Sequence, residues 1–383
     1  MSEIKVNSIK GVAASAAAIT VNNTDGTCTA NITNNLSNRN LIINGAMQVA
    51  QRGTSVSIGS DSNTYLIDRF KFGRNNAGDW TMSQSSESPD GFSNSLKIDS
   101  TSVTTGMGVN REVGLYQVFE GKDLQSIAKG TSSAKEITVS FYIKCNKNGI
   151  YNVELMDNDN SNRHVSKTYT VSNNNWTKHT ITFPADTTGA FDNDNGNSMH
   201  IYFWLAAGGQ FITGTRQETW GALNQGGRAE NQANLMDSAS NEWYITGVQL
   251  EVGSVATDFE FLSYADELRR CQRYYYVIAD GRTNNLENIS NAIGYATNQI
   301  EMVVHWPVEM RGIPNLAQVV GTNYYRVETV SSTINFDNFI LYQASIRSAL
   351  LYKNGLSTIT EGRGYRCCIN QTTPAYVHIE AEL

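Results

Sequence analysis

The chain is a succession of short segments in which apolar and polar residues alternate. Residues 137–144 place Ile, Val, Phe and Ile at every second position, and residues 199–205 repeat the pattern with Met, Ile, Phe and Leu. A period of two buries one face of a β-strand and exposes the other. Clusters of Asn, Asp and Gly separate such segments, with no helical spacers. The pattern predicts two antiparallel sheets packed face to face, a β-sandwich or jelly roll, over residues 41–262.

A strand, a turn and a helix are predicted where this region ends. Residues 244–252 alternate, and Gly253 and Ser254 then break the strand. Ser263 stands three residues before Asp266, an S-x-x-D capping box that predicts the start of a helix. After the helix come further strand patterns, among them "QIEMVVH", "YYRVETV" and "AYVHIEAEL". We therefore expect residues 263–383 to form a joint helix and a second, smaller β domain.

Residues 1–40 differ from both of these regions. They contain short strand-like pieces, "EIKVNSI", "AAITV" and "CTANIT", separated by Asn and Gly. About forty residues with so few large apolar side chains cannot bury a core of their own. Residues 1–40 are predicted to need partners, either further copies of themselves or a larger body on which they dock. A disordered leader is the alternative interpretation.

Composition and charge exclude several classes of function. Apolar residues make up 40% of the 383 residues, which is enough for folded domains, whereas charged residues make up only 17%. The net charge of −7 and the absence of Lys or Arg runs argue against nucleic-acid binding. No apolar run approaches the roughly 18 residues that span a bilayer, so membrane insertion is not expected. The surface is expected to consist largely of Asn, Ser, Thr, Gly and Gln, whose side chains can hydrogen-bond sugars.

The residues that usually carry catalysis or metal binding show no pattern of either. The five cysteines are an odd number without a C-x-x-C, and the five histidines are dispersed, so neither a disulfide framework nor a metal site or cofactor is expected. The acidic string that begins at Asp157 has Asn162 and Thr168 where an EF-hand needs Gly and Glu. Turns formed by Asp and Asn explain it better. The sequence has no nucleophile motif, and its scattered Asp and Glu residues do not mark a glycosidase pair. We therefore expect no catalytic residues.

Several strings resemble one known family. "NLIINGAMQVAQRGTS", "YLIDRF", "NLMDSASNEWYITGVQLEVG" and "CQRYY" are similar to bacteriophage tail-fibre proteins, many from marine viruses and cyanophages. The resemblance covers about residues 41–276. It implies a jelly-roll domain like that of carbohydrate-binding modules, followed by a C-terminal domain. "WPVEMRGIP" and the final "AEL" resemble family landmarks, but most of residues 277–383 departs from the family pattern.

The resemblance implies a non-catalytic structural protein of a phage tail, assembled in the host cytoplasm and carried on the virion. Residues 1–40 would bind a tail or baseplate protein, the chain would be a homotrimer, and the fibre would attach to a glycan or protein of the host surface. Two alternatives stay open. One is a head fibre or capsid decoration protein without a receptor role, and the other is a polysaccharide depolymerase.

Two groups of residues are candidates for receptor contact. A domain that adapts to different hosts should be the part that departs from the family, so the first group lies in the C-terminal domain. It is an aromatic and cationic mixture, the composition of adaptable binding surfaces: Tyr324, Tyr325, Arg326 and Tyr342. The second group is a glycan platform in the long polar segment 208–241, where Trp220 has Arg216, Asn224 and Arg228 nearby. For Trp220 itself, a packing anchor is the favoured interpretation.

Overall fold

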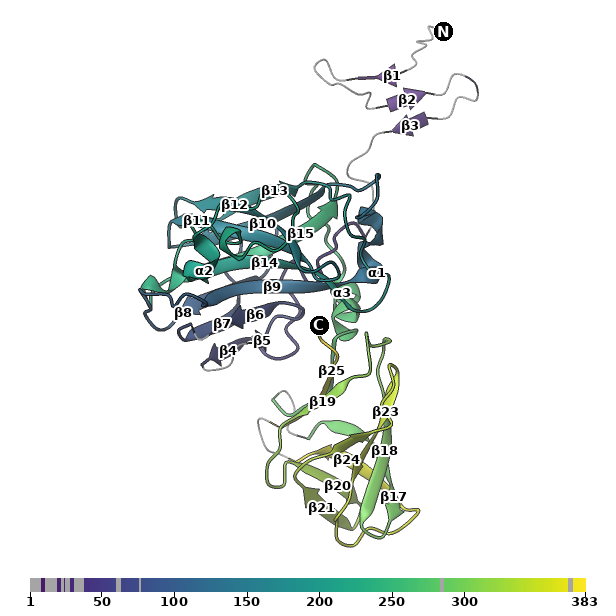
Figure 1. Ribbon diagram of the computed structural model, residues 1–383. Helices are drawn as coiled ribbons and strands as arrows, with labels where there is room; N and C mark the ends of the chain where they lie inside the picture. The colour runs from purple at the N-terminus through teal and green to yellow at the C-terminus, as the bar shows by residue number, and fades with distance from the viewer. Residues whose placement is uncertain are drawn as a thin grey trace.

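A β-sandwich forms the largest part of the protein in the computed structural model (Figure 1). The structure describes residues 8–10, 19–21, 24, 28–30, 38–59, 63–75, 77–282, 286–370 and 375–383. Two antiparallel six-stranded sheets pack face to face. The first contains, in spatial order, β13 (Thr177–Phe183), β10 (Ile137–Cys145), β15 (Glu242–Val252), β8 (Ser95–Ser100), β7 (Trp80–Ser85) and β4 (Ser55–Ile58). The second contains β12 (Arg163–Val171), β11 (Gly149–Asp157), β14 (Asn197–Ala207), β9 (Glu112–Glu120), β6 (Lys71–Arg74) and β5 (Asn63–Tyr65).

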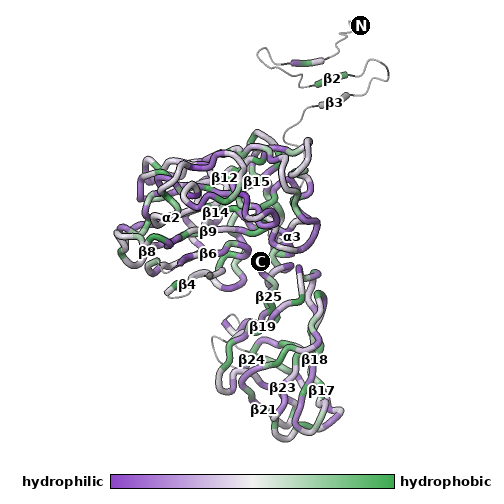
Figure 2. The backbone as a smooth tube through the Cα atoms, in the orientation of Figure 1, coloured by the Kyte–Doolittle hydropathy of each residue, from purple (hydrophilic) through white to green (hydrophobic). Residues whose placement is uncertain are grey.

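Alternation along the strands builds the core between the two sheets. Phe141 of β10 and Phe203 of β14 meet edge to face with ring centroids 5.2 Å apart, and both are fully buried. Such tilted aromatic pairs add to the free energy gained from burial alone. Figure 2 shows hydrophobic and hydrophilic stretches alternating along the chain in both domains. The predicted all-β fold, with a β-sandwich as its main body, is confirmed.

Helices are few and short in the part of the chain that the structure describes. They are α1 (Gly121–Leu124), α2 (Gly209–Ile212) and α3 (Tyr264–Gln272), with 3-10 turns at Gln125–Ile127, Gln225–Gly227 and Leu235–Asp237. The predicted capping box is present at α3, where Ser263 Oγ accepts a hydrogen bond from the backbone N–H of Asp266 at 3.2 Å. Within the described residues, none of the helices has the length and apolar character required to cross a bilayer.

The C-terminal domain follows α3 and contains two further antiparallel sheets. The smaller consists of β16 (Tyr275–Asp280), β25 (Tyr376–Glu380) and β19 (Asn315–Gln318). The larger consists of β21 (Ser332–Phe336), β20 (Tyr325–Thr329), β24 (Gly364–Ile369), β17 (Asn288–Ala296), β18 (Gln299–His305), β23 (Ser348–Lys353) and β22 (Ile340–Tyr342). A second hydrophobic core fills this domain, separate from the core of the sandwich.

The N-terminal segment contributes a small sheet of its own. Its described strands are β1 (Ser8–Ile9), β2 (Ile19–Val21) and β3 (Cys28–Ala30), which pair antiparallel in that order. This sheet lies apart from the two larger bodies (Figure 1). Most of residues 1–37 lies outside the described residues, and so do the predicted contacts of that segment with a tail protein or with other copies.

Arginine side chains of the sandwich stack on tyrosines of the C-terminal domain where the two domains meet. Arg69 of the sandwich lies 3.4 Å from the ring centroid of Tyr274, and Arg52 lies 3.5 Å from that of Tyr275. Arg273 and Tyr274 also reach across to the buried Glu120 at the end of β9. These contacts hold the two domains against each other.

Candidate functional site

The outer face of the second sheet carries a row of polar and aromatic side chains. The residues of β9 and β14 that do not enter the core point to this face, and the sheet register places them opposite one another. Tyr116 of β9 lies between Lys71 of β6 and Tyr202 of β14, its partners on the two neighbouring strands. Tyr202 in turn pairs with Glu154 of β11. One row thus crosses four strands that are far apart in the sequence.

The segment between β14 and β15 covers part of this face. Phe211 packs against Trp204, with ring centroids 5.2 Å apart. The Arg228 guanidinium reaches the Glu154 carboxylate, with Nε 2.9 Å from Oε1, and His164 Nδ1 lies 2.9 Å from the same oxygen. Although burial alone would raise the pKa of Glu154, the neighbouring Arg228 and His164 hold it at about 2. Glu154 is therefore ionised, fully buried and paired, and it is inaccessible to a substrate.

Beside this covered part, the face has a groove of about 380 Å³. This volume falls at the small end of the range for ligand-binding clefts, about 300–1,000 Å³. Its lining mixes aromatic, charged and amide side chains with one glycine: Lys71, Gly73, Arg74, Glu112, Tyr116, Val118, Asn197, His200, Tyr202, Arg228 and Leu383. Ten of these eleven residues belong to the sandwich, and Leu383 comes from the C-terminal domain.

Two stacked tyrosines form the floor of the groove. The rings of Tyr116 and Tyr202 have centroids 5.5 Å apart and planes inclined by 24°. Each ring leans over a glycine of the next strand, because a Cβ at Gly73 would lie 2.7 Å from Tyr116 Cε1 and one at Gly114 would lie 2.2 Å from Tyr202 Cε1. The two glycines therefore fix how low the tyrosine rings lie on the sheet.

Tyr116, His200 and Tyr202 are neutral donors and acceptors among the charged groups of the groove. Burial raises the pKa of both tyrosines, so their phenols stay protonated at neutral pH. Burial lowers the pKa of His200 to about 4, so its imidazole is neutral there too. Tyr202 is 6% exposed, and its hydroxyl has no hydrogen-bond partner within the described part of the chain. A buried hydroxyl without a partner is uncommon, and a ligand or ordered water would satisfy it.

The acidic string between β11 and β12 holds a lysine. The Lys129 ammonium is 2% exposed and contacts the Asp157 carboxylate, Asp186 Oδ2 at 3.1 Å, and the carbonyl oxygens of Thr188 and Gly189 at 2.9 and 2.7 Å. The other oxygen of Asp157 accepts hydrogen bonds from the backbone N–H groups of the second and third residues that follow it, at 3.0 and 3.1 Å. The turn expected from the sequence is thus present, and the protein's own cation occupies its oxygen cage.

The proposed glycan platform around Trp220 is not assembled as one surface. Trp220 packs against the sandwich core, donates from Nε1 to the Pro184 carbonyl at 2.9 Å and lies 5.3 Å from the Lys129 ammonium. The packing interpretation of this residue thus agrees with the structure. The expectation that Arg228 is available on an open platform is wrong, because its guanidinium is buried against Glu154.

The other two members of that platform also have partners within the segment. Arg216 Nε donates to Glu218 Oε1 at 3.2 Å. The backbone N–H of Asn224 donates to His164 Nε2 at 3.1 Å, which fixes the segment to the sheet. Arg216 and Asn224 therefore help to hold the segment that covers the sheet. Of the four predicted platform residues, only Arg228 lines the groove.

The four candidates in the C-terminal domain separate into core and surface. Tyr325 was expected to contact a receptor, and this is wrong: it is 0% exposed, and its hydroxyl donates to the carbonyls of Val319 and Tyr376, both at 2.7 Å. Tyr324 packs against the same core. Arg326 pairs with Glu328 at 2.8 Å.

Tyr342 is the exposed member of this group. It is 54% exposed at the edge strand β22, and its ring packs edge to face with Tyr352, centroids 6.1 Å apart. The structure therefore leaves Tyr342 as the one of the four that presents most of its ring to solvent.

Sequence reasoning did not identify Lys71, Tyr116, His200 and Tyr202 as a site. Their strand alternation was visible, because His200 and Tyr202 stand between the core residues of β14. The pairing of β9 with β14 was not, since it joins segments more than seventy residues apart. Nothing in the sequence of either segment indicates which strand it pairs with.

Comparison of the sequence with protein-family models and with curated proteins finds no match. Solved structures similar to the chain include the enzymatically active domain of tailspike protein 4 from bacteriophage CBA120, at 11% identity and a TM-score of 0.29. The alignment covers 56% of this chain but only 21% of the tailspike domain.

Carbohydrate-binding modules are also similar. The C-terminal family 22 module of Xyn10B from Clostridium thermocellum is 10% identical, with a TM-score of 0.30, over 58% of this chain and 99% of the module. A family 11 module of a cellulosomal cellulase from the same organism is 15% identical, with a TM-score of 0.28, over 52% of this chain and 99% of the module. Similarity at this level assigns no function, because one fold serves many functions.

Proposed function

We propose that the protein is a non-catalytic phage tail-fibre component that attaches the virion to a glycan of the host surface, and that the groove of Tyr116 and Tyr202 binds the sugar. The phage assignment rests on the sequence resemblance over residues 41–276. The sugar assignment rests on the groove. Its stacked tyrosines offer amphipathic rings, and the unpartnered Tyr202 hydroxyl supports a ligand that carries hydroxyl groups.

The lining of the groove favours binding over hydrolysis. Glycoside hydrolysis usually needs two carboxyl groups on either side of the scissile bond. Glu112 has the single carboxylate side chain among the lining residues, and Glu154 behind the wall is buried and held by Arg228 and His164. A polysaccharide digestion assay that released reducing ends, and lost that release in a Glu112→Gln variant, would favour the depolymerase alternative.

The binding test compares two tyrosines that belong to different candidate surfaces. Full-length protein is applied to an array carrying neutral and acidic oligosaccharides, among them cellohexaose, xylohexaose and a hexauronate, and the affinity for any retained probe is measured by calorimetry. Tyr116→Ala should weaken binding about tenfold or more, since truncating an aromatic residue at the centre of an interface commonly costs about 2 kcal/mol. Tyr342→Ala is the matched control, with an exposed tyrosine removed elsewhere. Loss of binding in Tyr342→Ala alone would place the receptor site in the C-terminal domain.

The head-fibre or decoration alternative differs in where the chain sits on the particle. It predicts density for this protein on the capsid and no glycan retention. A map of the intact virion, fitted with the sandwich and the C-terminal domain, separates it from the tail assignment.

A further inference from the structure

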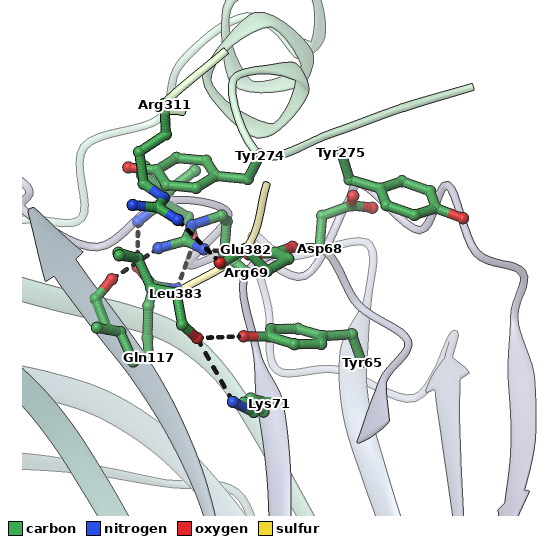
Figure 3. A network of polar contacts seen from close by, with 12 residues as sticks. Tyr65, Asp68, Arg69, Lys71, Gln117, Tyr274, Tyr275, Arg311, Glu382 and Leu383 are labelled. Carbon is green, nitrogen blue, oxygen red and sulfur yellow. Dashed lines mark hydrogen bonds and ion pairs between the residues drawn. The ribbon is translucent and has the colours of Figure 1, made fainter. Parts of the chain in front are cut away.

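Residues 381–383 follow the last strand of the C-terminal domain. Glu382 and Leu383 lie against the sandwich (Figure 3), and Leu383 lines the groove. The backbone N–H of Ala381 donates to the Tyr274 carbonyl at 2.8 Å. Arg311 donates to the carbonyl of Ala381 at 2.8 Å and to that of Glu382 at 3.1 Å. The path of this segment is therefore fixed by backbone contacts as well as by side chains.

Glu382 anchors the segment to a buried arginine of the sandwich. Its carboxylate forms an ion pair with Arg69, whose side chain is 1% exposed, and accepts from Arg52 at 3.1 Å. Arg69 in turn donates to the carbonyl of Val118 at 2.6 Å, on the strand that carries Tyr116. A buried guanidinium needs such a partner, because an unpaired charge in this position is costly. The ion pair thus links the C-terminal domain directly to β9.

The next residue forms part of the groove. The carbonyl oxygen of Leu383 accepts hydrogen bonds from the Tyr65 hydroxyl at 3.0 Å and from Lys71 Nζ at 3.4 Å. Lys71 Nζ lies 5.4 Å from the ring centroid of Tyr116. Contacts therefore run without interruption from Glu382, through Leu383 and Lys71, to the floor of the groove, and Figure 3 shows Tyr65 and Lys71 converging on Leu383.

We propose that residues 382 and 383 of the C-terminal domain complete the sugar groove, with Glu382 as a positioning residue that sets Leu383 and, through it, Lys71. This inference rests on the proposed function of the groove. If sugar binds preferentially to the completed groove, its binding and the docking of residues 381–383 must stabilise each other by the same free energy. The two domains then form one receptor-binding unit.

The test uses full-length protein and the saccharide on the array to which the wild type binds most strongly. Glu382→Gln removes the charge that pairs with Arg69 and should weaken saccharide binding about tenfold. Tyr65→Phe removes one hydrogen bond to Leu383 and should weaken it about threefold, in line with the contribution of single hydrogen bonds. Arg282→Met is the matched control: it removes contacts between the domains, to the carbonyls of Arg52 and Gln51, from a residue outside the groove. It should leave affinity unchanged.

A second measurement separates positioning from general damage. Saturating saccharide should slow hydrogen exchange at the Ala381 amide in the wild type and in Arg282→Met, and should not slow it in Tyr116→Ala. If Glu382→Gln fails to fold by circular dichroism, Tyr65→Phe and the exchange data decide. Wild-type affinity in both variants, with no protection of Ala381, would overturn this inference while leaving the groove as the sugar site. Absence of saccharide binding by the wild type would instead overturn the proposed function and this inference with it.

Discussion

Lys129 shows how one side chain organises the end of the sandwich. Its ammonium contacts two carboxylates and two backbone carbonyls while almost wholly buried. A lysine is rarely buried to this degree unless its charge is matched, and here Asp157 and Asp186 match it. The ammonium therefore ties three loops of the sandwich together.

Lys129→Met should destabilise the sandwich by about 3–5 kcal/mol, because Asp157 would remain buried without its counter-charge. Urea denaturation followed by tryptophan fluorescence measures this, since Trp306 is the one tryptophan of the chain outside the sandwich. Lys178→Met, at an exposed lysine of β13, is the control and should change stability by less than about 0.5 kcal/mol. Equal stability of both variants would show that the oxygen cage is solvated and gains little from the lysine.

At the scale of strands, the groove depends on glycines as much as on tyrosines. Gly73 and Gly114 leave room on neighbouring strands for the Tyr116 and Tyr202 rings. At Gly114 an added Cβ would also lie 2.6 Å from the Phe203 carbonyl oxygen, which cannot easily move. At Gly73 the obstacle is a side chain alone, so the ring can shift.

Gly73→Ala should accordingly weaken saccharide binding several-fold while leaving the fold intact. The added methyl group would displace the Tyr116 ring by a few tenths of an ångström or more from its place beside Tyr202. Gly364→Ala, in strand β24 with no atom within 4 Å of the added Cβ, is the matched control. Calorimetry with the saccharide to which the wild type binds most strongly gives the affinities, and thermal melting reports stability. Unchanged affinity in Gly73→Ala would mean that the position of Tyr116 does not matter for binding.

Strand patterns were readable from the sequence because they are local, whereas the site was not. The period of two in residues 199–205 placed Met, Ile, Phe and Leu in the core, and the capping box at Ser263 marked a helix that is present. The same reasoning, applied to Tyr325, would have placed it inside, since it alternates with the partly buried positions of β20 and precedes buried Val327 by two residues. The groove instead depends on which strands become neighbours, and that is settled by long-range pairing.

At the scale of the whole molecule, the sandwich and the C-terminal domain each have a hydrophobic core, and the described residues of the N-terminal sheet belong to neither core. Strands β1, β2 and β3 have two or three residues each, and Ile9 is 54% exposed. Sheets this small are marginal in water unless something covers them. Residues 38–40, by contrast, belong to the sandwich: the backbone N–H groups of Asn38 and Asn40 donate to Glu260 at 2.6 and 3.0 Å.

We therefore predict that the full-length chain is a homotrimer and that a chain beginning at Asn38 is a monomer with an unchanged groove. Pairing among copies would satisfy the edges of the short N-terminal strands and bury their apolar residues, and closed symmetry is the usual outcome for such contacts. Native mass spectrometry at micromolar concentration gives the oligomeric state of both chains, and calorimetry with the retained saccharide tests the groove. Three sites on one fibre would also raise apparent affinity on a glycan surface well above that of the shortened chain, because each further contact becomes intramolecular. A monomeric full-length chain would contradict the prediction. A trimer that persists without residues 1–37 would show that the contacts between copies lie in the larger domains. Ile293 and Val303 on the seven-stranded sheet, both half exposed, are then candidates for those contacts.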